Sequence, residues 1–118
     1  MKRLLLCLFA LALAARGAVT TPDEKKVTVI RESFRVELAI MARYRADPIK
    51  GYDDVRVMPA AERFFADAPL VGLPKAAVES LIGTATTQMY GNGETFIIRE
   101  ILYDESGLVS GIKKLKSR

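Results

Sequence analysis

The sequence predicts an α+β domain in which two or three N-terminal helices pack on a three-stranded antiparallel β-meander, with a signal peptide in front. Three observations lead to this prediction. The chain opens with two cationic residues and a short apolar run. Apolar residues then recur every three or four positions, which is the period of a helix. From residue 86 onward the apolar period falls to two, and turn-forming residues separate the segments as in hairpins.

The N-terminus has the pattern of a signal peptide. Lys2 and Arg3 precede an apolar run of 12 residues that ends at Ala15. A membrane-spanning helix needs about 20 apolar residues, whereas the core of a signal peptide is shorter. Ala15 and Gly17 supply the small residues that signal cleavage requires, so we expect residues 1–17 to be removed and the protein to be periplasmic or extracellular. An uncleaved anchor or a buried N-terminal helix is the alternative.

Cys7 does not have the setting of a lipid-modified cysteine. A lipid-bearing Cys follows a small residue at the end of the apolar core, but Cys7 follows Leu6 and lies within the core. We therefore expect no lipid anchor, and the only cysteine of the chain is removed with the signal.

The composition after cleavage narrows the possible functions. Loss of Lys2, Arg3 and Arg16 lowers the net charge from +4 to +1, so the pI near 9.4 belongs to the precursor and we expect no nucleic-acid partner. The mature chain has neither Cys nor His. This excludes a zinc site of the usual kind, a cysteine nucleophile and a Ser-His-Asp triad. We expect no enzyme activity, no cofactor and no metal.

A polar stretch precedes one predicted domain. Residues 18–25 are polar and include Pro22, so we expect a flexible leader. The remaining residues, 26–118, have a length that fits one domain with one modest core.

The first predicted element of the domain is one long helix at 24–46. Asp23 stands where it would cap the start, and Asp47-Pro48 ends the helical pattern. One face carries an apolar stripe with helical spacing, formed by Val27, Ile30, Phe34, Leu38, Met41 and Tyr44.

Two shorter helices are predicted next. Residues 48–58 form a connector, and helices follow at 59–67 and 74–82, each with a proline at its first position. Gly83 follows the last helix and fits a left-handed C-terminal cap.

The rest of the chain predicts a β-meander. We expect strands at 86–90, 95–103 and 108–115, joined by turns at 91–93 and 104–107. The middle strand is apolar on both faces, which indicates a central position in the sheet.

Two adjacent acid pairs are the remaining candidates for catalysis. Carboxylate chemistry needs two groups held in different environments. Asp53-Asp54 and Asp104-Glu105 both fall in predicted turns, where carboxylates are solvated. An enzyme that uses them remains the third and least favoured alternative.

Two short motifs lie within residues 69–116. The first has a Gly-aliphatic start, a helix with Val and then an aliphatic pair followed by Gly. The second reads aromatic-Asp-x-x-Gly-x-Val. They are formed by Gly72, Leu73, Val78, Leu81, Ile82 and Gly83, and by Tyr103, Asp104, Gly107 and Val109.

This stretch resembles the BamE-type (SmpA/OmlA) small envelope proteins. The resemblance implies helices against a three-stranded sheet and a non-enzymatic role, either in scaffolding outer-membrane protein assembly or in binding another envelope protein. Secreted inhibitors of β-lactamase use the same type of fold. The chain departs from the family in lacking a lipid-bearing Cys, in having Ala85 where the family has Pro, and in the extra helix at 24–46.

The leading functional prediction is an exported protein-interaction module with an envelope protein as its partner. Aromatic and Arg side chains on a free sheet face are typical interface anchors. The candidate binding residues are Ile97, Arg99, Ile101 and Tyr103. The alternative for these residues is packing against the N-terminal helix. The alternative function is binding of a small ligand or lipid in a cavity between the helices and the sheet, which the surplus of apolar residues at 96–102 favours.

Overall fold

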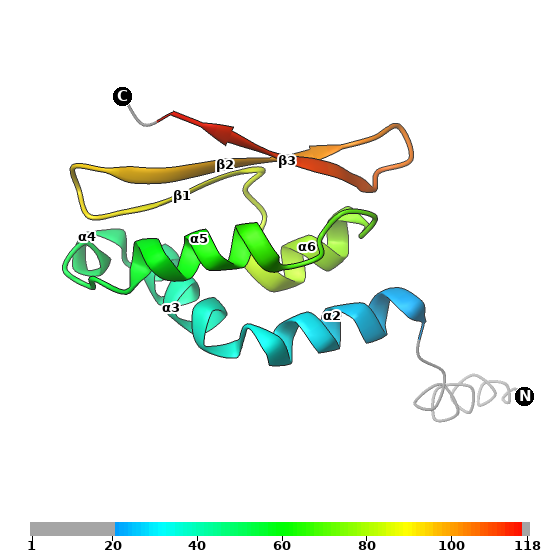
Figure 1. Cartoon of the computed structure of the whole chain (residues 1–118), viewed down its shortest axis with the longest axis horizontal. Coiled ribbons are helices and arrows are strands. Elements are labelled where there is room, and N and C mark those ends of the chain that lie inside the picture. The colour runs from blue at the N-terminus through cyan, green and yellow to red at the C-terminus, as the bar shows by residue number, and fades with distance from the viewer. Residues whose placement is uncertain (1–20, 117–118) are drawn as a thin grey trace, which may run out of the picture.

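The computed structural model describes residues 21–116, so the predicted signal peptide and residues 18–20 of the predicted leader lie outside it. Within this range, helices come first and three strands follow, and Figure 1 shows the helices on one side of the sheet. The predicted α+β class is confirmed. The helices are α2 (Pro22–Ser33), α3 (Arg35–Ala46), α4 (Pro48–Gly51), α5 (Val57–Asp67) and α6 (Lys75–Ile82). The strands are β1 (Thr87–Gly91), β2 (Phe96–Tyr103) and β3 (Val109–Leu115).

Helix α2 begins earlier than the sequence suggested. The side chain of Thr21 accepts a hydrogen bond from the Glu24 N–H, and the Glu24 carboxylate accepts one from the Thr21 N–H. This capping box satisfies two N–H groups that would otherwise lack partners at the helix start. Residues 22–25 are therefore helical rather than part of a flexible leader, and Thr21, not Asp23, is the cap.

The predicted single helix at 24–46 is two helices. The chain bends at Phe34, whose backbone (φ −117°, ψ 28°) leaves the helical region. The two halves have different main neighbours, since α2 contacts α6, whereas α3 contacts α5 most extensively and α6 less. The bend places the ring of Phe34 edge-on against that of Phe64, with 5.4 Å between the centroids.

The predicted connector at 48–58 is partly helical. Its first residues form α4, which Asp47 caps by accepting a hydrogen bond from the Lys50 N–H. Helix α5 begins at Val57, two residues before the predicted start. Gly83 follows α6 with φ 86° and ψ 178°, so the positive φ is as expected but the conformation lies outside the left-handed helical region.

The three strands form an antiparallel sheet in the order β1-β2-β3, as predicted. The first hairpin turns through Asn92, whose side chain accepts hydrogen bonds from the N–H groups of Glu94 and Thr95. The second turns through Asp104, whose carboxylate accepts from the N–H groups of Ser106 and Leu108.

The core lies between the sheet and the helices. Helix α5 contacts β1 and β2, α3 packs on α5, and α2 lies farther from the sheet, against α6 (Figure 1). The largest side chains with no or almost no exposed surface are Tyr90, Phe64, Ile30, Met41, Leu70, Leu73, Ile82, Val57, Val78 and Val109.

The loop before α6 continues the sheet beyond β3. The Gly72 N–H donates to the Val109 carbonyl, and the Val109 N–H donates to the Leu73 carbonyl, both at 2.8 Å. The two segments that carry the BamE-like motifs are therefore neighbours in space.

Candidate functional site

The residues predicted to form a free sheet face are turned toward the helices instead. Ile97 and Arg99 are 8% exposed and Ile101 is 3% exposed, while Tyr103 is half-buried beside the Lys75 ammonium group. Burial of Ile97, Arg99 and Ile101 contradicts the expectation that they are exposed on a free sheet face, and Tyr103 keeps only part of its surface accessible. Strand alternation places Arg99 in this buried layer opposite Gln88, and its guanidinium group donates to the Ile98 carbonyl at 3.0 Å.

The opposite face of the sheet carries an apolar row in which Met89 is exposed and Ile98 and Leu115 are half-buried. Met89, Ile98 and Leu115 are paired across the three strands in register, and we call them the outer row. Paired side chains in an antiparallel sheet share a face and lie about 4.5–5.5 Å apart at Cβ. Met89 is 46% exposed, and no helix of residues 21–116 covers this side of the sheet (Figure 1).

Polar and apolar side chains flank the outer row. The next row toward the second hairpin consists of Thr87, Glu100 and Lys113, and Leu102 lies beyond it with 38% of its surface exposed. An apolar strip beside charged groups is the usual arrangement at a protein-binding surface, where a polar rim surrounds an apolar centre.

The pattern of β2 alone does not identify its exposed face, because both faces are apolar. Arg99 and Tyr103 are residue types typical of interface anchors, which favoured the odd-numbered face. The register would have corrected this, since Ile97 pairs with Tyr90 while Glu100 pairs with Thr87 and Lys113. The residues paired across neighbouring strands identify the solvated face of the sheet better than the residue pattern of a single strand does.

A buried polar network lies under β1. The Arg45 guanidinium group donates to the Tyr90 hydroxyl at 2.8 Å, and that hydroxyl donates to Gln88 Oε1. The Gln88 amide nitrogen donates to the carbonyls of Ile82 and Ala85 at 3.0 and 2.8 Å. Burial raises the pKa of Tyr90, although the Arg45 charge opposes this shift. The network fixes the end of α6 to β1, and the tyrosine stays protonated near neutral pH.

A groove of about 300 Å³ runs beside β1. Arg45 is the only charged residue in its lining, and Pro48 and Tyr44 form part of the wall. The full lining is Tyr44, Arg45, Pro48, Ala85, Thr87, Gln88, Met89 and Tyr90. We call it the edge groove.

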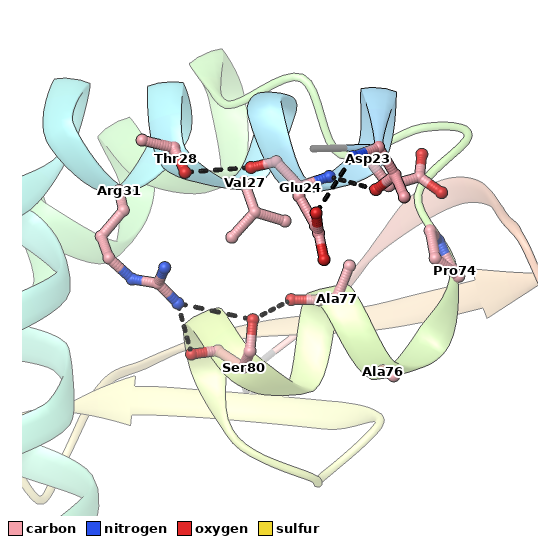
Figure 2. A pocket seen from close by; sticks show the side chains of 10 residues that line it. Asp23, Glu24, Val27, Thr28, Arg31, Pro74, Ala76, Ala77 and Ser80 are labelled. Atoms are coloured by element: carbon pink, nitrogen blue, oxygen red, sulfur yellow. Dashed lines mark hydrogen bonds between the residues drawn. The ribbon is translucent and has the colours of Figure 1, made fainter. Parts of the chain in front are cut away.

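A larger groove of about 470 Å³ separates α2 from α6. Figure 2 shows Val27 and Ala77 facing each other across it, while Arg31 reaches over to Ser80 and donates to its carbonyl at 3.2 Å. Asp23 lies near the other end of the groove (Figure 2). The groove lies between two helices and not between helices and sheet, where a ligand cavity was expected.

One member of each acid pair has a structural partner. Asp54 forms an ion pair with Arg56 at 2.8 Å, and Asp104 organises the second hairpin turn. Nowhere within residues 21–116 do three or more candidate ligands gather closely enough to hold a metal ion.

Comparison with known proteins identified no match. No protein-family model matches the chain, and neither does any curated protein or any solved structure. Within the described part of the chain, no helix has the length and apolar character needed to cross a membrane.

Proposed function

We propose that the protein is an exported, non-enzymatic interaction module of the cell envelope that binds a protein partner through the outer face of its sheet. The observation that carries this proposal is the outer row, an apolar strip that no element of residues 21–116 covers. Contiguous exposed apolar surface with a polar rim is typical of a protein-binding site.

Two further observations support a binding role over catalysis. The mature chain lacks Cys and His, and one member of each acid pair is engaged, Asp54 in an ion pair and Asp104 in a turn. The resemblance of residues 69–116 to BamE-type proteins favours an envelope partner, with a link to outer-membrane assembly as the most specific form of the proposal.

Crosslinking in the protein's own host tests this proposal. A photo-reactive amino acid is placed at Met89 or Leu102 on the outer face, or at Val29 on α2, which is 60% exposed and serves as the control. We expect one and the same envelope protein, identified by mass spectrometry, from the two outer-face positions and not from the control position. Absence of an adduct on the outer face, or equal adducts at all three positions, contradicts the proposal.

A charge placed in the outer row sharpens the test. Met89→Glu puts a carboxylate against an apolar partner surface and is expected to lower capture from position 102 by about tenfold, since hot-spot side chains carry most of the binding energy. Val29→Glu adds the same charge on α2 and is expected to leave capture unchanged.

A second candidate function is binding of a small ligand in the groove between α2 and α6. Its volume lies within the range of about 300–1,000 Å³ that is usual for ligand sites. Val27 and Ala77 provide apolar walls, while Asp23 and Arg31 provide charges toward its ends. Native mass spectrometry tests this candidate function. We expect a small molecule to co-purify with the unmodified protein and to be absent from Ala77→Leu, whose larger side chain fills the groove.

A further inference from the structure

The two edges of the sheet are protected to different degrees. The first part of the β3 edge pairs with the loop before α6, through the hydrogen bonds between Gly72, Leu73 and Val109. The rest of β3 carries the exposed side chains of Lys113 and Lys114. Lysines on an edge strand discourage pairing with another chain. The β3 edge is therefore closed to a further strand.

The β1 edge has none of these protections. The Ile101 N–H donates to the Thr86 carbonyl, and the Asn92 N–H donates to the Thr95 carbonyl. These bonds show that the even-numbered residues of this segment point their backbone groups toward β2. In an antiparallel pair, every second residue points its backbone groups away from its neighbour. Thr87 and Met89 thus direct their N–H and C=O groups toward the open edge. No proline or lysine lies within β1.

The edge groove follows this line of backbone groups. It is lined by side chains from both faces of β1, with Gln88 and Tyr90 from the helix side and Thr87 and Met89 from the outer side. A groove that touches both faces of one strand must run along that strand's edge. At one end the Gly91 backbone hydrogen-bonds the Tyr44 side chain, so the protein closes the edge there and leaves the part at Thr87 and Met89 open.

The charge of the groove indicates what kind of segment fits it. Arg45 is partly exposed and uses one nitrogen to bind the Tyr90 hydroxyl. Within residues 21–116 no carboxylate forms an ion pair with it, and none of the groove's lining residues is acidic. A guanidinium group in such a setting favours a carboxylate on the incoming chain.

We infer that the β1 edge receives an extended segment of the partner protein as a fourth strand, with a carboxylate of that segment against Arg45. Such β-augmentation takes its affinity from main-chain hydrogen bonds and its specificity from alternate side chains. Side chains on one face of the added strand extend the outer row beyond Met89. The inference rests on the proposed function, since it describes how the partner of the outer face is held.

A second copy of this chain fits the edge less well. In a symmetric pair of β1 strands, the opposing groove contributes another Arg45 and no acid. Both guanidinium groups are then left without a carboxylate. An acidic segment of a different protein supplies the carboxylate that Arg45 lacks, whereas a second copy of this chain does not.

A random peptide library displayed on phage, selected against the mature full chain, tests the inference. We expect enrichment of peptides rich in β-branched residues with Asp or Glu at one position. Synthetic versions are expected to slow hydrogen exchange at the N–H groups of Thr87 and Met89 in the unmodified protein. This readout does not depend on the folding of any variant. No enrichment, or protection confined to other residues, overturns the inference.

Substitutions on the edge provide matched controls. Met89→Pro removes an outward N–H without removing a ladder hydrogen bond and is expected to weaken peptide binding at least about tenfold. Met89→Ala keeps the N–H and is expected to weaken it less. Arg45→Gln is expected to weaken acidic peptides only. Equal affinity of Met89→Pro and Met89→Ala for the selected peptides overturns the edge inference. The proposed function is tested separately, by the crosslinks formed at Leu102.

Discussion

The Tyr90 hydroxyl donates a hydrogen bond to Gln88 Oε1, and the two side chains, two residues apart on β1, are both buried against the helices. Arg45 donates to the same hydroxyl from α3. Gln88 continues the network to carbonyls at and beyond the end of α6. Buried polar groups are tolerated when each finds a partner, and here every member of the network has one.

Removal of the Tyr90 hydroxyl is expected to destabilise the fold. Tyr90→Phe keeps the ring but leaves Gln88 Oε1 without its donor in a buried site. A buried group that loses its partner costs about 1–3 kcal/mol of the free energy of unfolding. Urea unfolding followed by circular dichroism measures this loss.

The control is Tyr103→Phe. Tyr103 is half-buried, and its hydroxyl makes no hydrogen bond within the described part of the chain. Its loss is expected to change the free energy of unfolding by less than about 0.5 kcal/mol. Equal losses for the two variants would show that the network adds no stability.

The sequence predicted the strands more accurately than the faces they present. Period two and the residues of the two turns placed all three strands within one residue of their observed bounds. The same pattern did not reveal which face is covered, because that depends on register between strands. Gln88 is a polar residue of the predicted strand at 86–90, and only its contact with the end of α6 explains its burial.

For the helices too, the sequence pattern did not reveal features that depend on tertiary packing. The apolar stripe from Val27 to Tyr44 is continuous, and no Gly or Pro interrupts it. The bend at Phe34 lets α3 pack mainly on α5 while α2 packs on α6, and this is a tertiary effect. The polar composition of residues 18–25 favours a leader, although Thr21 and Glu24 have the spacing of the capping box that the structure shows.

Gly83→Ala is expected to destabilise the junction between α6 and β1. With φ 86° and ψ 178°, Gly83 adopts a conformation that is essentially restricted to glycine. A Cβ there would also lie 3.2 Å from Arg45 Nε. We expect a loss of about 1–3 kcal/mol in the free energy of unfolding, measured by urea titration.

Gly111→Ala on β3 is the matched control. A Cβ at this position meets no atom within 4 Å, and Gly111 has no positive φ. Its stability is expected to stay within about 0.5 kcal/mol of the unmodified protein. A loss at Gly83 no larger than that at Gly111 would contradict the conformational argument.

The Asp54–Arg56 ion pair predicts a pH dependence of stability. The hydrogen bonds from Arg56 lower the pKa of Asp54 from 3.8 to about 2 in the folded protein. The unfolded chain therefore binds this proton more readily than the folded one. The stabilising contribution is present above about pH 4 and is lost as the pH falls toward about 2. Because the Arg56 side chain is 58% exposed, solvent screens the pair and we expect a small effect.

Asp54→Asn isolates this contribution, because its side-chain oxygen still accepts the Arg56 N–H while the charge is gone. The urea midpoint of Asp54→Asn is expected to lie below that of the unmodified protein near neutral pH. The two are expected to converge as the pH approaches about 2, where both side chains are neutral. Asp53→Asn is the control, since Asp53 makes no ion pair within residues 21–116. A midpoint difference for Asp54→Asn that is constant from neutral to acid pH would mean that the ion pair is not its cause.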